Sequence, residues 1–303
     1  QQSISDEDSG CVLEEYTWVP PGLTPLQVHQ YMISLPENKI PYAGGIGEKY
    51  RIKQLLHQLP PHDSETSYCN DLSEAEKKEL KLFTSRRRKE ALGKGVVVVV
   101  GLENDGTKCQ QCHVSFSSDQ LAVGASRAGS GSLWHPVCFT CCVCKELLVD
   151  LIYFYKDGKV YCGRHHAETL KPRCVACDEI IFADECTEAE GRSWHVKHFT
   201  CFDCDKLLGG QRYIMKDSHP YCCSCFGEIF TRPCTSCHLT IAPEEQQVVL
   251  NGFFWHATDA CFSCYSCGCC LLKKEFISQQ GQLFCSSACS IPTNRRHQLH
   301  RRH

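Results

Sequence analysis

The chain has 303 residues, a formal net charge of −3 and 26 cysteines. Cysteine at this density is typical of short secreted disulfide scaffolds, but the first residues lack the basic region and apolar run of a signal peptide, and we expect none. The slight negative charge argues against a general nucleic-acid-binding protein. The longest apolar run, Val96–Val100, is much shorter than the roughly 20 residues of a membrane-spanning helix.

The cysteines divide the chain into two parts. Only Cys11 and Cys69 precede residue 109, and the other 24 lie between residues 109 and 289. We therefore expect a cysteine-poor front region at residues 11–101, followed by a cysteine-dense array. Residues 1–10 are polar and acidic and residues 291–303 are basic, so both ends are expected to be disordered.

The first helix of the front region is predicted by its start signals. Thr24 can cap a helix that has Pro25 at its first position and that runs to about Leu35. The second helix is expected over 48–59, where Pro60 and Pro61 stop it. Its apolar residues recur on one face, and they are Ile52, Leu55, Leu56 and Leu59.

A capping box predicts the third helix, because Glu76 follows Ser73 by three residues. We expect this helix to end near Gly93. It contains the basic run Arg86–Lys89, which is compatible with a nuclear import signal or a patch for an acidic partner. A solvated helix end that favours cations explains the same run, and we prefer that interpretation.

The back part repeats a pattern of about 60 residues three times, which is typical of a tandem array. Each block begins with Cys-x2-Cys and, after a gap, continues with a His and a second Cys or His. A further Cys-x2-Cys follows, and after a second gap the block ends with a Cys and a last Cys or His. The first block supplies Cys109, Cys112, His135, Cys138, Cys141, Cys144, Cys162 and His165. The second supplies Cys174, Cys177, His195, His198, Cys201, Cys204, Cys222 and Cys225. The third supplies Cys234, Cys237, His256, Cys261, Cys264, Cys267, Cys285 and Cys289.

This spacing indicates tetrahedral zinc. Two thiolates from one tight turn fill two corners of a site, and a pair from a distant turn fills the other two. Eight ligands per block give two Zn²⁺ ions, and three blocks give six. Because the protein fills every position, the sites are structural and leave no place for substrate. Trp134, Trp194 and Trp255, with the Phe and Leu residues that recur at fixed offsets, are expected to form the small cores.

Some alternatives stay open in the ligand assignment. Asp259 stands at the usual ligand spacing after His256 and competes with Cys261, which we prefer because Cys261-Phe262-Ser263-Cys264 repeats the first block. His166 competes with His165, but Cys-x2-His fits better.

A disulfide framework would leave the five regularly placed His unexplained. The seven remaining cysteines are interpreted as small buried or partly exposed thiols rather than a seventh site, and they are Cys11, Cys69, Cys142, Cys186, Cys223, Cys269 and Cys270.

The three blocks resemble LIM domains, whose local signatures Trp-His and Cys-Phe-x-Cys recur here. The resemblance implies short β-hairpins and a short helix in each module. We place LIM modules at 109–166, 174–226 and 234–290, joined by eight-residue linkers at 166–173 and 226–233.

The front region resembles a PET domain, and the PET–LIM order with these motifs is similar to the Prickle family. The motifs are Trp18-Val19-Pro20-Pro21-Gly22, residues 53–63, and Cys162-Gly163-Arg164-His165-His166. The Val96–Val100 run departs from the family pattern.

The resemblance implies a non-catalytic adaptor of planar cell polarity and non-canonical Wnt signalling. Its partners would be Van Gogh-like membrane proteins and Dishevelled, with no nucleic acid and no small-molecule substrate. The chain would be cytoplasmic and would be recruited to the plasma membrane only through those partners. The nucleus would be a second location. The rival functions are a testin-like adaptor at actin and focal adhesions and a nuclear transcriptional cofactor.

Overall fold

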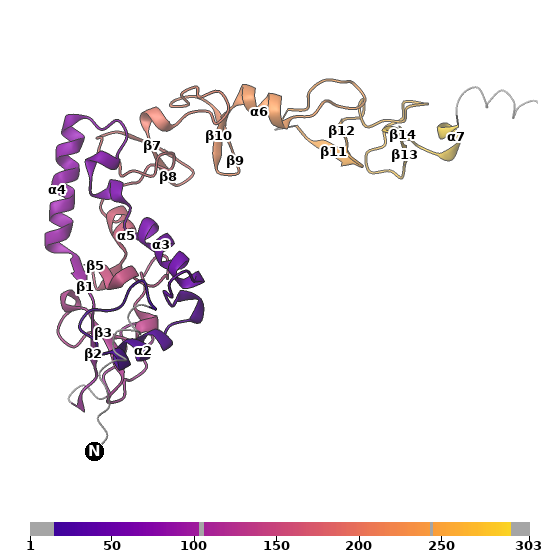
Figure 1. Ribbon diagram of the computed structural model, residues 1–303. Helices are drawn as coiled ribbons and strands as arrows, with labels where there is room; N and C mark the ends of the chain where they lie inside the picture. The colour runs from indigo at the N-terminus through magenta and orange to yellow at the C-terminus, as the bar shows by residue number, and fades with distance from the viewer. Residues whose placement is uncertain (1–14, 103–105, 243–244, 292–303) are drawn as a thin grey trace, which may run out of the picture. The chain divides into compact units, whose positions relative to one another are not determined.

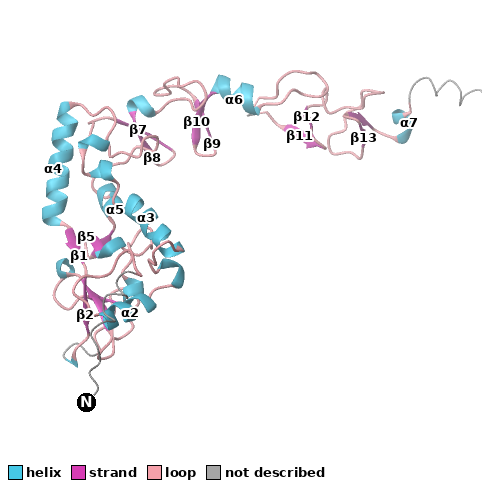
Figure 2. Cartoon of the chain, viewed as in Figure 1, coloured by secondary structure: helices cyan, strands magenta, loops and turns pink. Residues whose placement is uncertain are grey.

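A computed structural model describes residues 15–102, 106–242 and 245–291. The predicted disordered end at 1–10 and nearly all of 291–303 lie outside these residues. The chain forms two compact units, residues 1–198 and 199–303, and each is described by itself. Figure 1 colours the chain from its N-terminus to its C-terminus, and Figure 2 shows short hairpins and few helices in both units.

Within residues 15–102, three α-helices form in the segments where the sequence predicts them. They are α2 (Pro25–Ile33), α3 (Ile46–Gln58) and α4 (Glu74–Glu90). Both capping boxes are present, with Thr24 accepting from Gln27 and Ser73 accepting from Glu76. The short 3-10 turns of the first unit are η2 (Glu37–Lys39), η3 (Pro61–Asp63), η4 (Thr66–Tyr68), η6 (Ser126–Ala128), η7 (Pro136–Cys138), η8 (Val149–Leu151) and η9 (Val196–His198).

The apolar face predicted for α3 is only partly buried, since Leu55 and Leu59 are half-buried and the other two residues are exposed. Ile52 is 48 % exposed and Leu56 is 65 % exposed, whereas Gly47, Gln54 and Gln58 are buried. The reason is that this helix packs against the backbone of neighbouring segments. Polar side chains can form hydrogen bonds with that backbone, and glycine allows it to approach closely. A Cβ at Gly47 would lie 1.8 Å from the carbonyl oxygen of Ile40.

The expected end of the third helix near Gly93 is wrong. The helix ends at Glu90, and Gly93 lies in strand β1 (Leu92–Lys94). β1 pairs antiparallel with β5 (Ile152–Lys156), which pairs with β6 (Lys159–Tyr161). Only Gly fits at position 93, because a Cβ there would lie 2.3 Å from the ring of Tyr153.

The valine run forms a second such strand. β2 (Val96–Val99) pairs with β3 (Leu121–Gly124), which pairs with β4 (Leu133–Trp134). β-branched residues are favoured in strands. The end of the front region therefore adds one edge strand to each of the two sheets of the first cysteine block.

Polar contacts also join α3 to the first block. Gln58 is fully buried; its Nε2 donates to the Leu147 carbonyl at 2.7 Å, and its Oε1 accepts from the Val149 N–H at 3.1 Å. The Arg51 guanidinium donates two hydrogen bonds, of 2.8 and 2.7 Å, to the Asp150 carboxylate. The Leu147 carbonyl and the Val149 N–H thus have their hydrogen-bond partner in the front region.

The first half of the second block lies in the same unit. It follows α5 (Gly163–Glu168) and contains β7 (Cys186–Ala189) and β8 (Arg192–His195). Arg173, in the predicted linker, donates to both oxygens of Asp63 at 2.9 and 2.7 Å. The Asn70 N–H and side-chain amide both donate to Glu179. The front region therefore contacts the start of the second block as well as the first.

The described residues of the second unit form hairpins and two helices. The elements are β9 (Tyr213–Lys216), β10 (His219–Cys222), α6 (Cys223–Phe230), β11 (Gln247–Leu250), β12 (Phe253–His256), β13 (Ile277–Gln279), β14 (Gln282–Phe284) and α7 (Ser287–Ser290). The sequence treats residues 226–233 as a linker, but α6 continues to Phe230, where the rings of Phe226 and Phe230 pack 4.9 Å apart.

The recurring aromatic residues form the cores, as predicted. Trp134, Trp194 and Trp255 are all buried. Trp134 packs edge-on against Phe139, and Trp255 packs edge-on against Phe262. No helix within the described residues has the length and apolarity needed to cross a membrane.

Candidate metal centres

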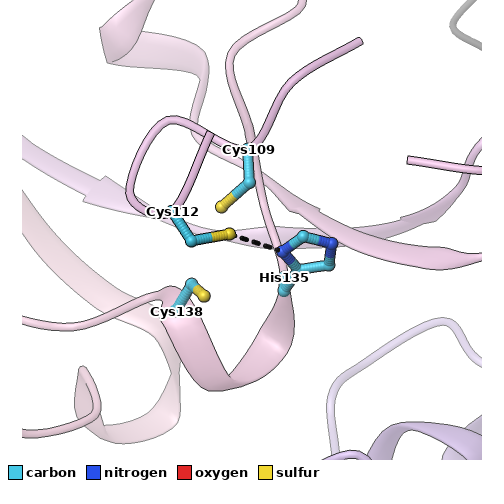
Figure 3. A group of neighbouring side chains, drawn as sticks. All are labelled: Cys109, Cys112, His135 and Cys138. Carbon is cyan, nitrogen blue, oxygen red and sulfur yellow. Dashed lines mark hydrogen bonds between the residues drawn. The ribbon is translucent and has the colours of Figure 1, made fainter. Parts of the chain in front are cut away.

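The first cluster joins two turns of the first block. Cys109 and Cys112 lie in the turn after residue 108, while His135 follows β4 and Cys138 ends η7. Figure 3 shows the four side chains converging on one point. Their ligand atoms all lie within 4.8 Å of one another, and the Cys112 Sγ is 3.4 Å from the His135 Nδ1.

The second cluster contains Cys141, Cys144, Cys162 and His165. The His165 Nδ1 lies 3.0 Å from the Cys162 Sγ and 3.6 Å from the Cys141 Sγ. A hydrogen bond from Cys162 lowers the pKa of Cys141 to about 3, although burial opposes this shift. The same hydrogen bond raises the pKa of Cys162, so the two thiols share a proton and Cys141 is the thiolate of the pair. A thiolate is the form of cysteine that binds metal.

His166, the alternative to His165, points to a different environment. Its ring stacks on Phe154 with centroids 5.0 Å apart, and its Nδ1 is 3.3 Å from the Nε of Arg87. The structure therefore places His165, and not His166, with the three cysteines.

The second block also forms two clusters, one in each unit. Cys174, Cys177, His195 and His198 group in the first unit, and Cys201, Cys204, Cys222 and Cys225 group in the second. A hydrogen bond from Cys177 lowers the pKa of Cys174 to about 2, against the effect of burial.

The third block brings Cys234, Cys237, His256 and Cys261 together. The Cys261 Sγ is 3.6 Å from the His256 Nδ1. Asp259 points elsewhere, since its Oδ1 accepts from the Cys270 thiol at 2.9 Å. The geometry therefore favours Cys261 as the fourth member.

The last four predicted ligands also approach one another. The Cys285 Sγ lies 3.6 Å from the Cys267 Sγ and 3.6 Å from the Cys289 Sγ. Burial raises the pKa of Cys264, but backbone N–H groups of Cys285 and Cys267 outweigh it and bring the value to about 6.

The donor sets fit zinc better than other common metals. The clusters described above offer either four sulfurs or sulfur together with imidazole nitrogen, the ligands that tetrahedral Zn²⁺ prefers, and not the oxygen atoms that Ca²⁺ or Mg²⁺ require. Four protein donors close each site. Such sites stabilise a fold and expose no position for a reacting water.

Comparisons with known proteins agree with this geometry. The PET domain family matches residues 1–98, and the LIM domain family matches residues 109–170 and 174–230. The chain is 61 % identical over 290 residues to human Prickle-like protein 2 and 57 % identical over 291 residues to human Prickle-like protein 1. It is 57 % identical over 288 residues to the protein prickle of Anopheles gambiae.

The chain belongs to the Prickle family. The three alignments cover 95–96 % of this chain and 31–35 % of the relatives, so the chain spans about a third of their length. A PET domain followed by LIM zinc-binding modules, built from small hairpin sheets, is therefore the architecture of this Prickle-family chain.

The basic run Arg86–Lys89 is neither a continuous patch nor simply a solvated helix end. Arg87 is only 6 % exposed; its guanidinium donates to the Gly163 carbonyl and lies 4.7 Å from the ring of Phe154. Arg86 is exposed and pairs with Glu90. Sequence reasoning missed the buried position of Arg87, because nothing in a run of four cations distinguishes the one that faces the neighbouring module.

Proposed function

We propose that this chain is a non-catalytic adaptor whose zinc-structured modules bind other proteins. Six structural Zn²⁺ ions, two in each of the modules at 109–166, 174–226 and 234–290, are bound by the 24 Cys and His residues predicted from spacing. The observation that carries the proposal is that the cysteine and histidine side chains converge in four-donor groups with no open ligand position.

The family supports a more specific function. We infer an adaptor role in planar cell polarity and non-canonical Wnt signalling, with Van Gogh-like membrane proteins and Dishevelled as partners. The chain would be cytoplasmic and would reach the plasma membrane through these partners. The nuclear-cofactor alternative is weakened because Arg87 is engaged with the first LIM module and is not available to an import receptor.

The PET region is proposed to extend over residues 11–101 in sequence but to act together with the first LIM module. β1 and β2 complete sheets of that module, and Gln58 satisfies its backbone groups. Any partner of the first LIM module therefore meets a composite surface of PET and LIM residues.

A pull-down tests the adaptor role. Zinc-loaded chain is offered an immobilised Van Gogh-like cytoplasmic tail, with F-actin as the parallel bait. We expect capture by the tail, loss of capture after zinc is removed with a chelator, and recovery when zinc is restored. Capture by F-actin alone would instead favour the testin-like adaptor, and capture by neither bait would contradict the proposal.

A further inference from the structure

A cavity of about 510 Å³ lies between α4 and the β1–β5 pair; we call it the α4–β1 cavity. Its floor is one face of the sheet, because Leu92, Lys94, Ile152 and Phe154 all line it and occupy paired positions of β1 and β5. Leu59 and Pro60 close one side. The volume is within the range of pockets that bind ligands and large enough for bulky side chains.

The charged groups of this cavity are predominantly positive. Arg87, Arg88 and Lys94 line it, and none of them forms an ion pair with a carboxylate of the described residues. The one acidic group in the wall, Asp63, is already engaged by the Arg173 guanidinium. The apolar floor therefore lies beside three cations that form no direct ion pair with a described carboxylate.

Arg87 makes the imbalance most pronounced. The residue is buried, and the hydrogen bonds of its guanidinium go to the Gly163 carbonyl and the His166 ring, both uncharged acceptors. Burial lowers its pKa to about 10, so it remains charged at neutral pH. Asp63 and Cys162 attract this charge from a distance, but no carboxylate is hydrogen-bonded to it. Burying a charge is costly, and an anion in the cavity would add to the attraction.

We propose that the α4–β1 cavity binds a short partner peptide in which a bulky apolar residue is flanked by Asp or Glu. The apolar side chain packs on Leu92, Ile152 and Phe154, and the carboxylates face Arg88 and Lys94 at the rim. This inference rests on the proposed adaptor role and locates a surface for it. Because the cavity needs both α4 of the PET region and β5 of the first LIM module, only the joined modules present it.

The test uses the zinc-loaded full chain as the target for a phage library of random nonamer peptides. We expect enriched peptides to contain an acidic residue within two positions of Leu, Ile, Phe or Trp. A synthetic copy of the best peptide should bind the Arg88→Glu/Lys94→Glu variant at least tenfold more weakly, since opposite charges at the rim become like charges. Lys81→Glu is the matched control, because Lys81 is an exposed cation of α4 outside the cavity, and it should change affinity less than twofold.

Two further readouts distinguish a failure of the cavity proposal from a failure of the proposed adaptor role. A benzophenone at the apolar position of the peptide should crosslink to residues 88–94 or 152–154, which locates the site without a variant. Enrichment of neutral or basic peptides, no enrichment, or unchanged affinity for the double variant would overturn the proposal. If the double variant still captures the Van Gogh-like tail as the unaltered chain does, the adaptor role stands and this cavity is not its site.

Discussion

The His135→Ala variant is expected to lose one zinc ion and the folded structure around the first cluster. His135 is one of a group of four possible donors, and its partners Cys109, Cys112 and Cys138 come from two separate turns that a bound ion would join. A structural zinc site contributes about 10–16 kcal/mol in peptide models, which is comparable with the whole stability of a typical domain. Native mass spectrometry after a brief chelator challenge should find five zinc ions instead of six.

Two controls make this result specific. His29→Ala removes an exposed imidazole of α2 that belongs to none of the cysteine groups, and it should retain all six ions. His135→Cys keeps a donor at the same position and should recover most of the zinc affinity. Six ions retained by His135→Ala would mean that the first ligand set is assigned wrongly.

Removing Asp63 is expected to have the second largest effect. The Asp63–Arg173 pair is almost fully buried, with the side chains 5 % and 8 % exposed. Removing one partner of a buried pair costs about 3–5 kcal/mol, because the remaining charge stays buried without compensation. For Asp63→Ala we expect the lower end of that range, since Arg173 still contacts Glu168 at 2.7 Å.

The measurement is hydrogen exchange of the zinc-loaded chain, read over the segment that contains η3 and α4. The opening free energy there should fall by about 3 kcal/mol in Asp63→Ala. Glu79→Ala provides the comparison, because the Lys171–Glu79 pair also joins α4 to the linker but is exposed, and exposed pairs are worth about 0–1 kcal/mol. Equal effects of the two changes would show that burial of the Asp63–Arg173 pair is unimportant.

The convergence of Cys and His side chains in groups of four was predictable, because tetrahedral coordination imposes a regular spacing on the sequence. Cys-x2-Cys turns place two sulfurs at one site whatever surrounds them, so the spacing alone was enough to group residues such as Cys174, Cys177 and His195. Helix starts were predictable for a similar reason, since a capping box such as Ser73 with Glu76 is a local device.

The joining of the PET region to the first LIM module was not predictable from local patterns. Val96–Val99 pairs with Leu121–Gly124 across a loop, and no spacing rule connects the two segments. Gln58 and Arg87 are polar residues of a kind usually expected on the solvated face of a helix, yet their partners are carbonyl groups in another module. Such side chains are buried because they form hydrogen bonds with backbone groups that would otherwise lack a partner. The sequence does not show which backbone groups these are.

The count of bound metal tests the central claim most directly. Native mass spectrometry of the intact chain, saturated with zinc and then freed of excess by buffer exchange, should show one dominant species with six zinc ions. The third module decides the count, because the LIM family model matches residues 109–170 and 174–230, and the two zinc sites of the third module are assigned from spacing and geometry. A dominant species with four ions would contradict the assignment of Cys234, Cys237, His256 and Cys261 and of the last four cysteines as zinc ligands.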